Sequence, residues 1–126
     1  YILNVASSAA FLPGPLMATY YATKAYVQRL TLAMRKELQK RNSHVSVSVL
    51  CPGPVQTEFD RVANVKFMMK GKTSMDIAEY AIRTMFERKA MLIPGMLMKG
   101  SYLLCKCLPL AVQMEASYHI QHRKNR

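Results

Sequence analysis

Hydrophobic and polar positions along this chain follow two alternating kinds of pattern. Short apolar runs rich in β-branched residues occur at residues 1–5, 44–54 and 90–95, and each ends in small residues, proline or glycine. Between these runs, residues 19–39 and 74–89 carry apolar side chains at steps of three and four. The first pattern is typical of strands covered on both faces, and the second is typical of amphipathic helices. The order strand, helix, strand, helix, strand predicts an α/β fold with a parallel sheet.

Each predicted helix has an apolar stripe and recognisable ends. In the first helix the stripe is formed by Val27, Leu30, Met34 and Leu38. In the second helix it is formed by Ile77, Ala81, Ile82 and Met85. Ser74 is placed as the N-cap of the second helix, because a serine hydroxyl satisfies unpaired amides at a helix start. Both stripes are expected to face the core.

The last third of the chain is apolar but interrupted. From Leu97 onward we expect a helix that breaks at Pro109 and ends in a polar tail containing His119 and His122. Lysines and prolines within residues 91–112 make a membrane-spanning helix unexpected. Leucine- and methionine-rich turns beside basic residues leave peripheral contact with a membrane surface open for this region.

Composition narrows the function classes without choosing one. The chain has 126 residues, 51% of them hydrophobic, which predicts one compact domain. The net charge of +11 is scattered and lacks the aromatic interleaving of nucleic-acid surfaces, so no nucleic-acid partner is predicted. Three cysteines without a disulfide framework indicate a reducing compartment such as the cytoplasm. Cys105 and Cys107 have no partner pair at metal-ligand spacing, so no metal site is predicted.

Candidate chemistry gathers where the first two strands end. Ser7 follows the first strand, and Tyr20 and Lys24 lie one turn apart at the start of the first helix. The carboxyl ends of parallel strands meet at one edge of the sheet, where ligands bind. A cation one turn from a phenol favours the phenolate, and a serine hydroxyl can hold a substrate oxygen. This set suits proton transfer coupled to hydride transfer at carbon.

Three stretches in this order and spacing, "NVASS" (4–8), "YYATKAYV" (20–27) and "LCPGPVQTEF" (50–59), resemble the short-chain dehydrogenase/reductase family. The resemblance implies a Rossmann-like doubly wound parallel sheet. It also implies NAD(P)-dependent interconversion of a secondary alcohol and a ketone, with NADP somewhat favoured over NAD.

The resemblance also assigns roles to residues. Ser7 would orient the substrate, Tyr20 would act as acid and base, and Lys24 would bind the nicotinamide ribose and favour the phenolate. The segment expected to touch the nicotinamide end of the cofactor comprises Pro52, Gly53, Val55 and Thr57. Tyr21 and Ser8 are the neighbouring alternatives. Tyr20 is preferred because it stands four before Lys24, and Ser7 because it stands three after Asn4.

Details of the chain are similar to one branch of the family, which holds bacterial reductases of unknown substrate and 3-oxoacyl-CoA and 17β-hydroxysteroid enzymes. A hydrophobic substrate, acyl or steroid-like, is therefore expected, as is a homodimer or homotetramer. Residues 59–70 fall where the family places its substrate loop, although an ordinary helix with a core stripe fits them equally well.

The family's glycine-rich turn for the pyrophosphate is not found in this sequence. We therefore expect residues 1–126 to be the C-terminal catalytic half of one NAD(P)-binding domain, inactive and weak in dinucleotide binding by itself. Two other functions stay open: a nucleotide-sugar epimerase or dehydratase of the extended branch, and a non-catalytic basic module that binds polyanions.

Overall fold

The computed structural model describes residues 1–56 and 71–124 and contains a three-stranded parallel sheet. Its strands are β1 (Ile2–Val5), β2 (Val47–Leu50) and β5 (Met91–Leu92), in the order β1-β2-β5. The register pairs Asn4 with Val49 and Val49 with Met91. The predicted α/β fold with a parallel sheet is confirmed.

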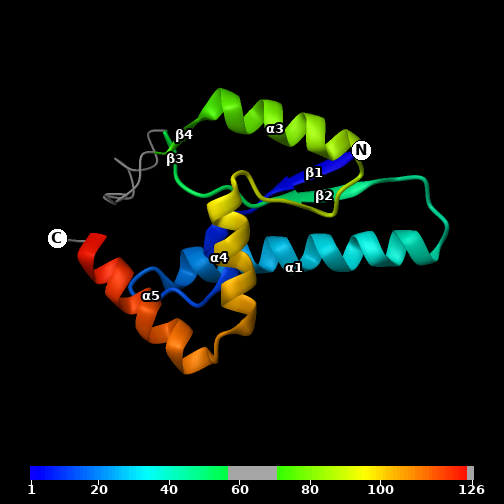
Figure 1. Ribbon diagram of the computed structural model, residues 1–126. Helices are drawn as coiled ribbons and strands as arrows, with labels where there is room; N and C mark the ends of the chain where they lie inside the picture. Colours follow the sequence, from blue (N-terminus) through cyan, green and yellow to red (C-terminus); the bar gives the residue numbers. More distant parts are fainter. Residues whose placement is uncertain (57–70, 125–126) are drawn as a thin grey trace.

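Two helices cover the two faces of this sheet (Figure 1). A short 3-10 helix, η1 (Ser8–Phe11), follows β1 and leads to α1 (Ala18–Lys40) on one face. The helix α3 (Ser74–Phe86) lies on the other face. The ends of both helices lie within about three residues of the ranges 19–39 and 74–89 that the periodicity predicted.

The core consists of two clusters separated by β2, because successive side chains of a strand point to opposite faces. Val49 and Cys51 belong to the cluster that Val27 of α1 joins. Leu50 belongs to the cluster on the α3 side. Ser48, between Val47 and Val49, is also buried, and its hydroxyl donates a hydrogen bond to the Lys89 carbonyl at 2.7 Å. The predicted double-sided burial of β2 is confirmed.

The side of α1 that faces the sheet differs from the predicted stripe. Leu30 and Met34 are 41% and 37% exposed, whereas Thr31 is 1% exposed. Thr31 Oγ1 accepts a hydrogen bond from Asn4 Nδ2 at 2.9 Å and donates to the Val27 carbonyl at 2.6 Å. Paired polar groups are tolerated in a core, so the buried face of α1 is partly polar and the prediction for Leu30 and Met34 was wrong.

The start and the buried face of α3 also need correction. Thr73, rather than Ser74, is the N-cap, and its hydroxyl oxygen accepts from the Asp76 amide at 3.1 Å. Ile82 is 53% exposed, while Thr84 is 3% exposed and takes its place in the buried face. The prediction for Ile77 and Ala81 is confirmed by their burial.

The predicted terminal helix forms two helices that meet at Pro109. These are α4 (Met96–Cys107) and α5 (Leu110–Lys124), and α5 lies beside the first turns of α1 (Figure 1). His119 and His122 therefore belong to a helix and not to a polar tail, because helical hydrogen bonding continues to Lys124. None of the helices in the described ranges has a segment long and apolar enough to cross a bilayer.

Two further short strands pair in parallel, β3 (Val55–Gln56) and β4 (Lys72–Thr73). The Gln56 amide also donates to the Gly71 carbonyl at 2.7 Å. The irregular connection predicted for residues 56–72 thus has paired ends. Thr57 and the expected substrate loop at 59–70 lie outside the described residues.

The three thiols occupy different environments, and we predict that they react in a fixed order. Cys107 is exposed, Cys105 is half-buried and Cys51 is buried. Burial raises the pKa of Cys51 to about 11, so its reactive thiolate is scarce at pH 8. Pulse labelling with iodoacetamide and peptide mass spectrometry should modify Cys107 first and Cys51 only after denaturation in urea. Equal labelling of Cys51 and Cys107 in the native protein would contradict this fold.

Candidate active site

Backbone hydrogen bonds hold the segments after β1 and β2 side by side. The Ala6 amide donates to the Leu50 carbonyl at 2.8 Å, and the Ser8 amide donates to the Pro52 carbonyl at 2.8 Å. Parallel pairing therefore continues past the ends of both strands. The residues that follow the two strands meet at one edge of the sheet, as the sequence predicted.

Ser7 is fixed in this edge as the cap of η1. Its Oγ accepts a hydrogen bond from the Ala9 amide at 3.1 Å, and its carbonyl accepts from the Ala10 amide at 3.0 Å. A serine hydroxyl has two acceptor lone pairs and one hydrogen, so the cap leaves that hydrogen able to donate. Ser7 thus offers a donor from a position that the local backbone determines.

Tyr20 and Lys24 lie one turn apart near the start of α1. Lys24 Nζ is 5.7 Å from the centroid of the Tyr20 ring, which is within the range of a cation–π contact. Both side chains are half-buried. The structure therefore brings the predicted cation and the predicted phenol together.

A single cavity of about 1000 Å³ joins most of the predicted site residues. The predicted residues that line it are Ser7, Tyr20, Pro52, Gly53 and Val55, and the neighbouring alternatives Ser8 and Tyr21 line it as well. Lys24 is not among the lining residues and reaches the cavity only through its contact with the Tyr20 ring. Thr57 cannot be placed, because it lies outside the described residues.

The second tyrosine of the pair has a different environment. Burial raises the pKa of Tyr21, and its hydroxyl is in hydrogen-bond contact with the Gln121 amide of α5. The rings of Tyr20 and Tyr21 are 6.1 Å apart at an angle of 76°. Tyr21 therefore links α1 to α5 through its hydroxyl. Because that hydroxyl is already engaged, Tyr20 is favoured as the tyrosine that exchanges protons.

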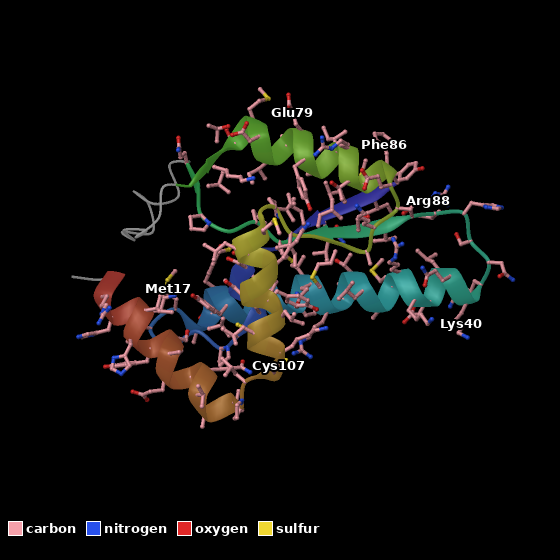
Figure 2. All side chains as sticks on the ribbon, viewed as in Figure 1. Met17, Lys40, Glu79, Phe86, Arg88 and Cys107 are labelled. Carbon is pink, nitrogen blue, oxygen red and sulfur yellow. The ribbon has the colours of Figure 1, made fainter. Side chains whose placement is uncertain are left out.

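The far walls of the cavity come from α3, α4 and α5, far along the chain from Ser7 and Tyr20. Most of these residues are apolar or small: Ile77, Ala78, Ala81, Ile82, Met98, Leu104, Leu108, Ala116 and Ile120. In Figure 2, Met17 at the start of α1 lies next to α5, and Cys107 lies at the end of α4 where the chain turns toward α5. Helices α4 and α5 thus enclose the side of the cavity opposite the strand ends.

Three polar residues of α5 line the cavity and were not predicted as site residues, namely Gln113, Ser117 and Gln121. They follow one another at four-residue steps and therefore share one face of the helix. This row of polar residues, on a helix whose other cavity-lining residues Ala116 and Ile120 are apolar, was the signal in the sequence that could have identified them. Within residues 1–56 and 71–124, no cluster of His, Cys, Asp or Glu is arranged to hold a metal ion.

Comparison with known proteins gives a consistent picture. The family model described as short chain dehydrogenase matches residues 1–66. The CLA biosynthesis dehydrogenase/reductase of Lactiplantibacillus plantarum is 40% identical over 63 residues, covering 50% of this chain and 22% of that protein. Human dehydrogenase/reductase SDR family member 11 is 30% identical over 93 residues, covering 65% of this chain and 36% of that protein.

Solved structures agree on the fold. A short chain dehydrogenase from Burkholderia cenocepacia, in complex with NADP, superposes with a TM-score of 0.69 at 24% identity. The match covers 88% of this chain and 44% of that one. The chain therefore spans less than half the length of each of these proteins.

Gly14 should be needed to seat Tyr21. A Cβ added at Gly14 would lie 2.1 Å from Tyr21 Cγ, so Gly14→Ala must displace the ring or the loop. We expect a loss of about 1–3 kcal/mol in the free energy of unfolding, as for other overpacked sites. Thermal unfolding followed by circular dichroism measures this loss.

Gly100→Ala is the matched control, because a Cβ there has no atom within 4 Å and the residue lies inside α4. That variant should gain about 0.5–1 kcal/mol from helix propensity. If both variants unfold at the wild-type temperature, the packing of Gly14 against Tyr21 is not as described.

Proposed function

Because this chain belongs to the short-chain dehydrogenase family, we propose that it is the C-terminal catalytic half of an NAD(P)-dependent oxidoreductase. The reaction is the interconversion of a secondary alcohol and a ketone. The observation that supports this most strongly is that Ser7 and Tyr20 line one cavity while Lys24 contacts the Tyr20 ring.

Each polar group has a distinct task in the proposed mechanism. The Ser7 hydroxyl donates a hydrogen bond to the substrate oxygen and holds it beside Tyr20. The Tyr20 phenol gives its proton to that oxygen during reduction and takes a proton during oxidation. We propose that the Lys24 ammonium, which lies over the Tyr20 ring, stabilises the phenolate that forms during the reaction.

The residues present fit the nicotinamide end of a dinucleotide. Pro52, Gly53 and Val55 line the cavity beside Ser7 and Tyr20 and offer a small, largely apolar surface suited to a flat ring. We propose that these residues and Thr57 hold the nicotinamide and that Lys24 holds its ribose. The bound nicotinamide supplies or accepts the hydride. NADP is the favoured dinucleotide, as in the Burkholderia cenocepacia structure.

The proposed substrate is hydrophobic, of acyl or steroid-like size and polarity. Apart from a few polar groups, the cavity walls from α3, α4 and α5 are aliphatic. A volume of about 1000 Å³ is at the upper end of small-molecule sites, so an extended or polycyclic substrate fits beside a nicotinamide.

Replacing the proposed acid and base tests the mechanism. In the full-length protein, Tyr20→Phe should lower kcat/KM for ketone reduction by about 10²-fold or more, because positioned proton transfer contributes that much. The measurement is NADPH oxidation with a panel of apolar ketones. Tyr26→Phe is the control on the same helix, because Tyr26 is 66% exposed and does not line the cavity. Wild-type rates in Tyr20→Phe, or an equal loss in Tyr21→Phe, would remove Tyr20 from this role.

Peripheral membrane contact is a second proposed property, and the surface of α4 supports it. Met96, Leu97 and Leu103 are 87%, 59% and 65% exposed. Lys99 and Lys106 are exposed on the same helix. Apolar side chains beside lysines are the combination with which interfacial helices bind anionic lipid.

Vesicle binding tests this property. The full-length protein should co-sediment with phosphatidylcholine vesicles containing phosphatidylserine, less with pure phosphatidylcholine, and less at high salt. The double variant Lys99→Glu with Lys106→Glu should lower binding about tenfold or more. Each lysine near an anionic surface contributes about 1 kcal/mol of attraction, and the glutamates replace this attraction with repulsion. The matched control is Lys36→Glu with Lys40→Glu, since Lys40 lies at the far end of α1, away from α4, in Figure 2. Equal effects of the two pairs would show that net charge alone attracts the protein.

A further inference from the structure

The inner face of α5 carries two buried polar side chains that are not fully paired. Ser117 and Gln121 are each 1% exposed, and both line the cavity. Ser117 Oγ and Gln121 Oε1 have no hydrogen-bond partner in the part of the chain that the structure describes. Buried polar atoms in native proteins are nearly always paired, so each exception needs an explanation.

Internal packing does not provide that explanation. The Gln121 amide nitrogen is already in contact with the Tyr21 hydroxyl, which fixes the side chain and leaves its oxygen as an acceptor. Ser117, one turn before it, can donate or accept. A hydroxyl group that donates to Gln121 Oε1 and accepts from the Ser117 hydroxyl would satisfy both atoms.

The pair also lies close to the proposed reaction centre. Tyr21 contacts Gln121 with its hydroxyl, and its ring is 6.1 Å from the ring of Tyr20. The neighbouring α5 residues that line the cavity, Ala116 and Ile120, are apolar. A molecule that places its carbonyl at Tyr20 therefore meets, on this part of α5 and between aliphatic side chains, two polar atoms that are unpaired within the described residues.

We propose that Ser117 and Gln121 form a subsite for a second hydroxyl group on an otherwise apolar ketone or alcohol. This inference rests on the proposed function and adds a substrate class to it: the substrate carries two oxygen functions, one that reacts and one that is recognised. Tyr21 is a positioning residue for this subsite, because it orients the Gln121 amide.

A series of bicyclic ketones tests the subsite. The probes are 2-decalone and derivatives of it with one hydroxyl group at successive ring positions, assayed by NADPH oxidation with the full-length protein. Wild type should reduce at least one hydroxylated ketone with a kcat/KM about tenfold or more above that of 2-decalone, because a buried polar site discriminates against a ligand that leaves it unpaired. Ser117→Ala and Gln121→Leu should each abolish this preference, so that the ratio of kcat/KM for the hydroxylated ketone to kcat/KM for 2-decalone falls to about one.

Gln113→Leu is the matched control for a polar-to-apolar change on the same helix and in the same cavity. The Gln113 amide donates to the Cys105 and Leu108 carbonyls at 2.9 and 2.8 Å, so it is already paired. This variant should lose thermal stability and keep the hydroxyl preference. Ser117→Ala should show the reverse, since it removes no hydrogen bond present in the structure.

The outcomes separate this inference from the proposed function. Turnover of ketones without preference for any hydroxylated probe would overturn the subsite and leave the proposed reaction intact. A preference that survives in both Ser117→Ala and Gln121→Leu would do the same. Turnover of no ketone by wild type would overturn the proposed reaction. In that case the rise in unfolding temperature caused by each probe still decides the subsite, because it needs no catalysis. Should Gln121→Leu fail to fold, the nearly isosteric Ser117→Ala decides alone.

Discussion

The structure depends on the burial of β2 between two neighbouring strands and two covering helices. Val47, Val49 and Cys51 have no exposed surface, and β2 pairs in parallel with β1 on one edge and β5 on the other. A strand in this position fixes where the chain leaves the sheet after Leu50. The Ser8–Pro52 hydrogen bond follows from that pairing and brings the segments that carry Ser7 and Gly53 to one side of the cavity.

The elements were predictable from the sequence because their periodicity reflects which faces are buried. The same periodicity did not identify what each face contacts. On α1 the apolar step from Leu30 to Met34 points away from the sheet, while Thr31 faces it through a hydrogen bond to Asn4. A buried threonine with a partner satisfies the core as well as an aliphatic residue does, and that partner lies 27 residues away in the sequence. Only the tertiary structure shows it.

The candidate site likewise has a part that the sequence predicts and a part that only the tertiary structure shows. The placement of Ser7, Tyr20 and Lys24 was predictable because their spacing is local: Ser7 follows a strand, and Tyr20 and Lys24 share a helical turn. The wall formed by α5 was not, because its contact with Tyr21 joins residues 100 apart. Resemblance to a family identifies the shared chemistry at the strand ends. The proposed hydroxyl subsite belongs to α5, where the only sequence signal was a row of polar residues at four-residue steps.

Adjacent tyrosines at the start of α1 connect these two parts of the site. Both line the cavity, but Tyr20 lies under the Lys24 ammonium, while Tyr21 packs against Gly14 and contacts Gln121. Successive helix positions point about 100° apart, so one residue can contact the reacting atoms while the next anchors the helix. A shift of α5 would therefore move Tyr21 and the backbone that carries Tyr20. Through this contact, the position of α5 would influence the proposed proton donor as well as the space that the proposed substrate fills.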